Sequence, residues 1–181
     1  MDGSNSLGDR AMTNRVYAQI LYDEIRSADS RGGLYVWIDP DEHSILKLGS
    51  LVSDAPFKPI QSTTMHVTVL FHQDHLPFGV KPPLDRRCTG SLVRLKVWTD
   101  HKGKKVLVCE IDSPDLQRLH QELLGEGLAH SFPDYQTHLT LCYDTPAEAA
   151  VRLWIEQKNQ ELADQPIQLA FGPQLKAEAL N

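Results

Sequence analysis

Residues Thr63–Phe71 read Thr-Thr-Met-His-Val-Thr-Val-Leu-Phe, a polar lead followed by a mostly apolar run. Valine and phenylalanine favour β-strands, and a strand points successive side chains to opposite faces. His66 and Thr68 therefore share one face of the expected strand, while Val67 and Val69 occupy the other. The pattern predicts a strand with a buried apolar face that presents an imidazole and a hydroxyl side by side on its other face.

An altered copy of this pattern lies at Gln136–Tyr143, which reads Gln-Thr-His-Leu-Thr-Leu-Cys-Tyr. His138 and Thr140 share one face here, and Leu139 and Leu141 share the other. A single His-x-Thr triplet is usually a hydrogen-bonded polar pair of no catalytic importance. Two triplets in strands of matching polarity favour a symmetric catalytic pair instead.

The expected elements repeat their order around the two copies. A strand and then a helix precede each His-x-Thr strand. Asp39 and Ser113 are the expected caps of these two helices, each followed by a proline in the first turn. In chain order we expect a helix over 13–30, a strand over 34–38, a helix over 39–52, the first His-x-Thr strand, a hairpin of strands over 91–99 and 105–111, a helix over 113–124, the second His-x-Thr strand, a helix over 145–162 and a strand region over 166–175.

This order is typical of an α+β protein with an internal repeat. With 181 residues, 41% of them hydrophobic, the chain is long enough for one domain with a sizeable core. We expect residues 1–12, which are rich in Gly, Ser, Asn and Asp, to form a disordered tail. Residues 13–181 are expected to form the single domain, of two similar lobes with an added N-terminal helix.

Charge and cysteine content exclude several classes of protein. A formal net charge of −6 argues against binding to long nucleic acid, which depends on phosphate neutralisation by Lys and Arg. Cys88, Cys109 and Cys142 are odd in number and widely spaced, which predicts neither a disulfide framework nor a zinc site. The sequence has no apolar run long enough for a membrane span and no signal-peptide core. These features favour a cytoplasmic protein.

The two His-x-Thr copies predict acid–base chemistry on a phosphodiester. Histidine titrates near neutrality, so one imidazole can remove a proton from an attacking oxygen while the other protonates the leaving oxygen. The threonine hydroxyl beside each imidazole can donate a hydrogen bond to a phosphoryl oxygen. This scheme assigns catalysis to His66, Thr68, His138 and Thr140 and requires no metal or other cofactor.

Aromatic and basic side chains on two other strands are candidates for substrate binding. Tyr35 and Trp37 share one face of their strand, and Arg94, Lys96 and Trp98 share one face of theirs. Aromatic planes stack bases at ~1–3 kcal/mol each, and Arg and Lys hold phosphates. The alternatives are packing beneath a helix for Tyr35 and Trp37 and a solvated outer strand face for Arg94 and Lys96. Trp98, near a hairpin turn, is more typical of recognition than of a core.

Two other functional classes stay open at this stage. His72, Asp74 and His75 could serve a metal-dependent hydrolase, although they lie in a Pro-rich loop over 72–87 that also has the length of an active-site lid. A non-catalytic nucleotide-binding protein, a sponge that sequesters its ligand, would use the aromatic and basic residues without the imidazole pair. An assay of substrate mass separates hydrolysis from sequestration.

The paired motifs resemble those of the 2H phosphoesterase family over about residues 33–175. This resemblance implies two pseudo-symmetric lobes, with antiparallel sheets around a central groove, helices outside and one His-x-Thr on each side. It also implies a metal-independent enzyme with the catalytic set His66, Thr68, His138 and Thr140. Relatives of this kind include 2′,3′-cyclic phosphodiesterases and 2′-5′ RNA ligase-like enzymes, which are the alternative functions.

Within that family the chain is most similar to the compact phage anti-CBASS nucleases. The short separation of His66 from His138 and the early Gly-Leu-Tyr-Val at Gly33–Val36 carry this resemblance. It implies that Tyr35 and Trp98 hold bases, and that the partner is a cyclic di- or trinucleotide used by bacteria as an antiviral signal. The implied reaction is hydrolysis of 3′-5′ bonds in the host bacterial cytoplasm.

Overall fold

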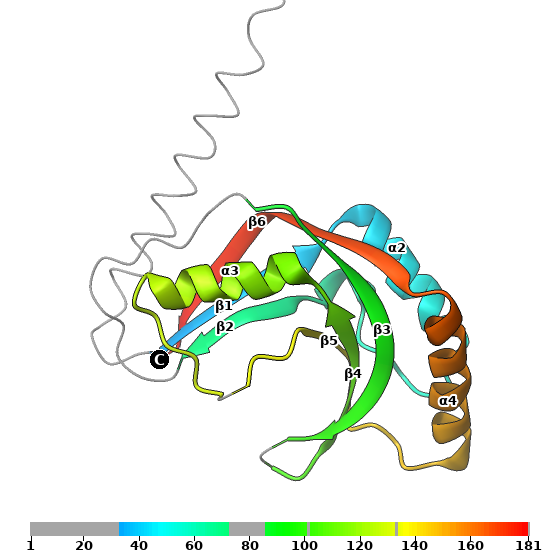
Figure 1. The fold of residues 1–181 in the computed structure, drawn as a ribbon. Coiled ribbons are helices and arrows are strands. Elements are labelled where there is room, and N and C mark those ends of the chain that lie inside the picture. Colours follow the sequence, from blue (N-terminus) through cyan, green and yellow to red (C-terminus); the bar gives the residue numbers. More distant parts are fainter. Residues whose placement is uncertain (1–32, 73–85, 101, 133, 181) are drawn as a thin grey trace, which may run out of the picture.

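The structure is a computed structural model that describes residues 33–72, 86–100, 102–132 and 134–180. Within these ranges the protein is α+β, as expected from the sequence, with helices and antiparallel strands (Figure 1). The expected tail over 1–12, the helix over 13–30 and residues 73–85 of the proposed lid lie outside the described residues.

Three helices and six strands occur in the described part of the chain, along with a short 3-10 turn at Ser62–Thr64. Their order repeats the strand–helix–strand unit that the sequence predicted. The elements are β1 (Gly33–Pro40), α2 (Glu42–Leu51), β2 (Val67–His72), β3 (Cys88–Thr99), β4 (Lys105–Asp112), α3 (Pro114–Gly125), β5 (His138–Tyr143), α4 (Ala149–Asp164) and β6 (Ile167–Leu180).

All six strands join one antiparallel sheet that closes on itself in the order β1-β2-β5-β4-β3-β6. β6 closes the ring because its first part pairs with β3 and its longer second part pairs with β1. Gly172 lies where β6 passes from one partner to the other, and its φ of 102° favours glycine. A Cβ atom at Gly172 would also collide with the carbonyl oxygen of Arg86. The sheets implied by the resemblance are thus one continuous sheet here, since β6 spans both halves.

The two His-x-Thr strands lie in units that repeat in register as well as in order. We call β1, α2 and β2 lobe one, and β4, α3 and β5 lobe two. In lobe one, Val67 pairs with Ile38 and the ladder then shifts by one residue at a β-bulge before Val36. In lobe two, Leu139 pairs with Cys109 and the ladder shifts at the same distance from the histidine. The repeated bulge makes the two lobes equivalent position by position.

A single apolar core lies between the sheet and its helices. The strand residues that follow each histidine and each threonine are fully buried in it, namely Val67, Val69, Leu139 and Leu141. α2 packs against β6, and α4 packs against β3 on the outer side of the curved sheet (Figure 1). α3 packs against β2, the first His-x-Thr strand.

Two helix starts differ from the expectation. The cap of α2 is Asp41, whose carboxylate accepts a 2.8 Å hydrogen bond from the Ser44 amide, and not Asp39. Pro40 remains in β1, where it pairs with Phe171, so the chain turns into the helix later. α4 begins at Ala149, later than the predicted start at Thr145.

Candidate active site

The structure brings the two His-x-Thr copies together where β2 meets β5. Val67 pairs with Leu139, and each of these residues directly follows one of the two histidines. The charge of His66 acts on the pKa of His138, as expected for neighbouring imidazoles. His66, Thr68, His138 and Thr140 are all partly exposed beside buried neighbours.

Both imidazoles are held by the same kind of hydrogen bond. Nδ1 of His66 lies 3.1 Å from the carbonyl oxygen of Thr64, and Nδ1 of His138 lies 2.7 Å from that of Gln136. A carbonyl oxygen only accepts hydrogen bonds, so Nδ1 carries a proton in both rings. Nε2 is therefore the atom that gains or loses a proton in each histidine, and the main chain fixes its orientation.

Tyr35 joins the first histidine to the first threonine. Its hydroxyl lies 2.5 Å from Nε2 of His66 and 3.0 Å from Oγ1 of Thr68. Burial raises the pKa of Tyr35, which keeps the phenol protonated. Its ring stacks on Trp37, with centroids 5.1 Å apart and planes inclined by 23°. Both aromatics predicted on this strand thus lie beside His66, and Tyr35 also supplies a polar group to it.

Trp98 occupies the corresponding place beside the second histidine. Its ring centroid lies 4.4 Å from that of His138. Burial lowers the pKa of His138, and the charge of His66 lowers it further, while the hydrogen bond to Gln136 and the charge of Glu110 oppose the shift. Proton transfer at His138 is therefore tuned to a pH below that of an exposed histidine.

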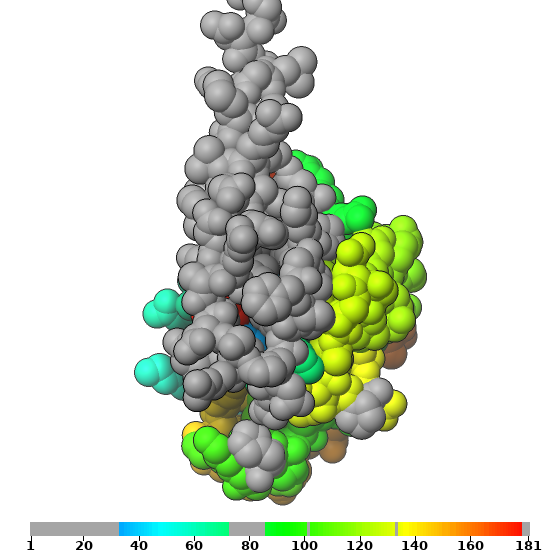
Figure 2. Space-filling model, turned by 90° about the vertical axis from the view of Figure 1, so that its left-hand side faces the viewer, coloured from blue at the N-terminus to red at the C-terminus, as the bar shows by residue number. Residues whose placement is uncertain are grey.

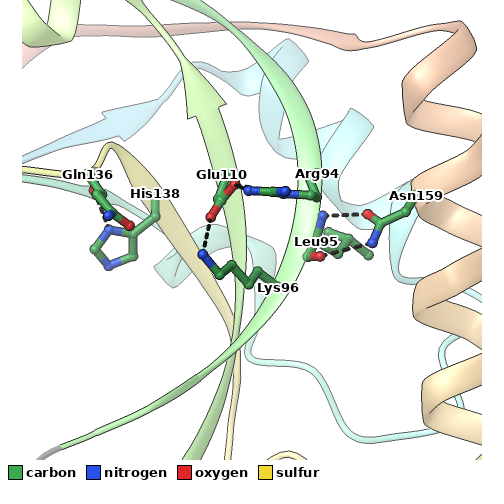
Figure 3. Close-up of polar contacts among 7 residues, drawn as sticks. All are labelled: Arg94, Leu95, Lys96, Glu110, Gln136, His138 and Asn159. Atoms are coloured by element: carbon green, nitrogen blue, oxygen red, sulfur yellow. Dashed lines mark hydrogen bonds and ion pairs between the residues drawn. The ribbon is translucent and has the colours of Figure 1, made fainter.

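Arg94 and Lys96 are both engaged by one carboxylate (Figure 3). Nη2 of Arg94 lies 2.5 Å from Oε2 of Glu110, and Nζ of Lys96 lies 3.2 Å from Oε1 of the same residue. Burial tends to raise the pKa of Glu110, but the hydrogen bonds from Arg94 and Lys96 outweigh it and hold that pKa below its usual range. Glu110 pairs with His138 across β4 and β5. The two predicted phosphate ligands thus form a charge network beside His138.

A side chain of α4 hydrogen-bonds to the main chain of β3 next to this network. Asn159 of α4 accepts a 2.7 Å hydrogen bond from the Leu95 amide and donates a 3.0 Å bond to the Leu95 carbonyl (Figure 3). Leu95 lies between Arg94 and Lys96 in the chain. Its amide and carbonyl are therefore satisfied where β3 has run past its pairing with β6.

A cavity of about 470 Å³ adjoins the paired motifs, a volume typical of small-molecule sites. It reaches the predicted residues Tyr35, Thr68, Trp98 and His138, and it is also lined by residues that the sequence reading did not single out. These additional lining residues are Phe71, Thr99, Asp100, His130, Phe132, Asp134, Tyr135 and Gln136. Most of them belong to the segment 128–136, which lies directly before the second His-x-Thr. Its two aromatic residues close to a histidine are the feature of the sequence that could have indicated a binding segment.

Comparison with known proteins shows the family of the chain. Residues 32–171 match the family described as anti-CBASS protein Acb1. The chain belongs to the Acb1 family. The Acb1 protein of Vibrio phage KVP40 is 32% identical over 113 residues, which cover 62% of this chain and 73% of that protein. The Acb1 protein of Acinetobacter phage Ac42 is 34% identical over 91 residues, covering 50% and 59%. That of Yersinia phage phiR1-RT is 27% identical over 124 residues, covering 65% and 76%.

Four further observations concern the other classes of function. Of the residues suggested for a metal site, His72 is buried at the end of β2, and Asp74 and His75 lie outside the described ranges. Within those ranges no three His, Cys, Asp or Glu side chains are grouped as metal ligands would be. Cys88, Cys109 and Cys142 are buried free thiols. Among the described helices, none is both long enough and apolar enough to cross a membrane.

Proposed function

We propose that this Acb1 family member is a metal-independent phosphodiesterase of the 2H type. It hydrolyses 3′-5′ bonds of cyclic di- and trinucleotide signals and thereby counteracts CBASS antiphage immunity, as the name of its relatives suggests. The observation that carries the proposal is the pair of imidazoles at the β2–β5 junction, each with Nδ1 held by the main chain, so that Nε2 is the atom that can exchange a proton. General acid–base catalysis needs this arrangement of one proton acceptor and one proton donor.

The reaction proceeds in two steps that use the two rings in turn. Nε2 of one neutral imidazole takes the proton of the substrate's 2′-hydroxyl, and the 2′-oxygen attacks the adjacent phosphorus. The bond from phosphorus to the 5′-oxygen breaks, and that oxygen takes a proton from Nε2 of the other, protonated imidazole. This opens the ring and leaves a 2′,3′-cyclic phosphate, which water hydrolyses with the roles of the two imidazoles exchanged.

The threonine hydroxyls stabilise charge on the phosphoryl oxygens during both steps. Oγ1 of Thr68 lies 3.0 Å from the Tyr35 hydroxyl, so it is placed to hold an oxygen atom at hydrogen-bond distance. That same hydroxyl lies 2.5 Å from Nε2 of His66. One oxygen atom can therefore contact a histidine and a threonine of the same motif at once, as the proposed transition state requires.

Mass spectrometry of the reaction products tests this proposal. Wild-type protein is incubated with cyclic dinucleotides, cyclic trinucleotides, RNA ending in a 2′,3′-cyclic phosphate and 2′-5′ oligoadenylate. We expect the cyclic oligonucleotides to be opened, with and without EDTA. His66→Ala and His138→Ala should each lower the rate by roughly 10²–10⁴-fold while the protein stays folded. His43→Ala, which removes an exposed histidine of α2, is the matched control.

The same assay separates the alternatives. Turnover of only the RNA substrates would replace the proposal with an RNA-processing function. Unchanged mass combined with tight binding would replace it with a sponge. Loss of activity in EDTA, or full activity in His66→Ala, would count against the two-histidine mechanism.

A further inference from the structure

Part of the cavity lining is an aromatic wall, formed by Phe71 and Phe132, that the proposed reaction does not use. Phe132 is 57% exposed, although large apolar side chains are usually buried. Its ring stacks on Phe71, with centroids 5.7 Å apart and planes inclined by 25°. Both rings line the same cavity as Thr68 and His138. An exposed aromatic plane beside a catalytic pair is suited to stacking against a base.

This wall is fixed to the strand that carries the first motif. The Ser131 amide donates to the Phe71 carbonyl at 2.8 Å, and the Phe71 amide donates to Nδ1 of His130 at 3.1 Å. The Tyr135 hydroxyl donates to the carbonyl of Thr68 at 3.1 Å. Figure 2 shows the segment 128–136, in yellow, between α3 and the β3–β4 hairpin, which is green. The wall is therefore held at a set position relative to the catalytic threonine.

The segment 128–136 also carries a carboxylate that takes no part in the described polar contacts. Asp134 lines the cavity and makes no hydrogen bond or ion pair with any other described residue. Asp100, the other acidic residue of the cavity, instead caps a turn by accepting from the Lys102 and Lys104 amides at 2.8 Å. A carboxylate repels phosphate and accepts hydrogen bonds only, so Asp134 suits a base edge that carries N–H donors.

Lobe one has no counterpart of this wall among the described residues. The segment that precedes its His-x-Thr strand carries Phe57, which packs edge-on against Trp154 with centroids 5.2 Å apart. Phe57 thereby joins the core and does not line the cavity. The catalytic pair is nearly symmetric, but its surroundings differ on the two sides.

We infer that Phe71, Phe132 and Asp134 form a subsite for one nucleobase of the substrate, and that this base is guanine. This inference rests on the proposed function, because it takes the occupant to be part of a cyclic oligonucleotide. The base stacks on Phe132, and its adjacent N1–H and N2–H groups donate to the two oxygens of Asp134. Adenine lacks this pair of neighbouring donors. The subsite selects which nucleotide lies on one side of the scissile phosphate.

Equilibrium binding without turnover tests the subsite independently of hydrolysis. Cyclic di-guanylate and cyclic di-adenylate are titrated against His66→Ala protein by calorimetry. We expect cyclic di-guanylate to bind about tenfold more tightly than cyclic di-adenylate, in line with the discrimination of a bidentate contact. Adding Asp134→Asn should remove most of this preference. Adding Phe132→Ala should weaken both ligands, while Asp164→Asn and Leu153→Ala, exposed positions on α4, should change neither.

Product analysis gives a second readout in the otherwise wild-type enzyme. A ring with one guanosine and one adenosine has two 3′-5′ bonds, and the subsite predicts that one linear product dominates at low conversion. Asp134→Asn should make the two products more nearly equal. An unchanged binding preference and product ratio in Asp134→Asn would overturn the subsite even if hydrolysis is normal. Failure of hydrolysis with a preference that depends on Asp134 would overturn the proposed reaction and leave the subsite standing.

Discussion

Val67 pairs with Leu139, and through this pairing two histidines that are distant in the chain lie beside one another. Each histidine precedes one of the paired residues, so the main chain, and not a flexible loop, sets their relative position. In both lobes the β-bulge follows the threonine of the motif, so the two copies keep the same local form.

Removal of the Thr68 hydroxyl should slow the chemical step. Valine has nearly the shape of threonine, so Thr68→Val deletes the hydrogen-bond donor with little change in volume. We expect kcat for ring opening to fall roughly 10²-fold, the effect typical of losing one donor to a developing oxyanion. Thr68→Ser keeps the hydroxyl and should retain most of the activity. Full kcat in Thr68→Val would show that this hydroxyl does not contact the reacting phosphate.

Tyr35→Phe should separate the two roles of this side chain. The variant loses the hydroxyl that contacts His66 and Thr68 but keeps the ring that stacks on Trp37. We expect kcat to fall about tenfold, the equivalent of one hydrogen bond, while KM changes little. Steady-state kinetics measure both constants. A rise in KM alone would assign Tyr35 to binding only.

Glu110→Gln should change the pH dependence of the reaction. The negative charge of Glu110 raises the pKa of His138, against the larger effect of burial, so its removal lowers that pKa further. The limb of the profile of kcat/KM against pH that belongs to His138 should therefore move to lower pH, and the other limb should stay. Glu122→Gln, which breaks the exposed ion pair with Arg86, is the control. An unshifted profile would contradict the electrostatic link between Glu110 and His138.

Acid should destabilise the protein through His130. Burial, together with the charges of the neighbouring His120 and His72, lowers the pKa of His130 to about 4. Between pH 6.5 and about 4 the unfolded chain binds a proton at this position and the folded chain does not, so stability falls as the pH falls. Protonation also removes the acceptor for the Phe71 amide.

The melting temperature measured across this pH range tests the role of His130. We expect His130→Asn to show a smaller decrease in melting temperature on acidification than the wild type. His43→Asn, on the exposed side of α2, should keep the wild-type slope. Parallel curves for the wild type and His130→Asn would assign the acid sensitivity to other groups.

Local patterns in the sequence were sufficient for most of the fold. Period-two alternation predicted both His-x-Thr strands and their buried faces, and Ser113 followed by Pro114 predicted the start of α3. The predicted cap of α2 was wrong because aspartates flank Pro40 on both sides, at Asp39 and Asp41. The choice between them depends on how far β1 pairs with β6, a contact distant in the chain.

The rest of the site depends on contacts that no local pattern encodes. The partnership of Arg94 with Glu110 requires the strand register after a β-bulge in the β3–β4 ladder. The place of the segment 128–136 requires hydrogen bonds to β2, such as that from the Phe71 amide to His130, across 59 positions of the chain. The segment has no repeating apolar pattern, so its sequence indicates only a connection between two elements.

The ring of strands also has a consequence for biosynthesis. β6 follows the other five described strands and supplies a neighbour of both β1 and β3. While the ribosome is still adding residues before position 167, both of those strands keep an open edge, which is the kind of surface that aggregates or recruits chaperones. The nascent polypeptide thus completes its barrel only after translation has passed β6, and a prematurely terminated product is exposed to proteolysis along two strands at once.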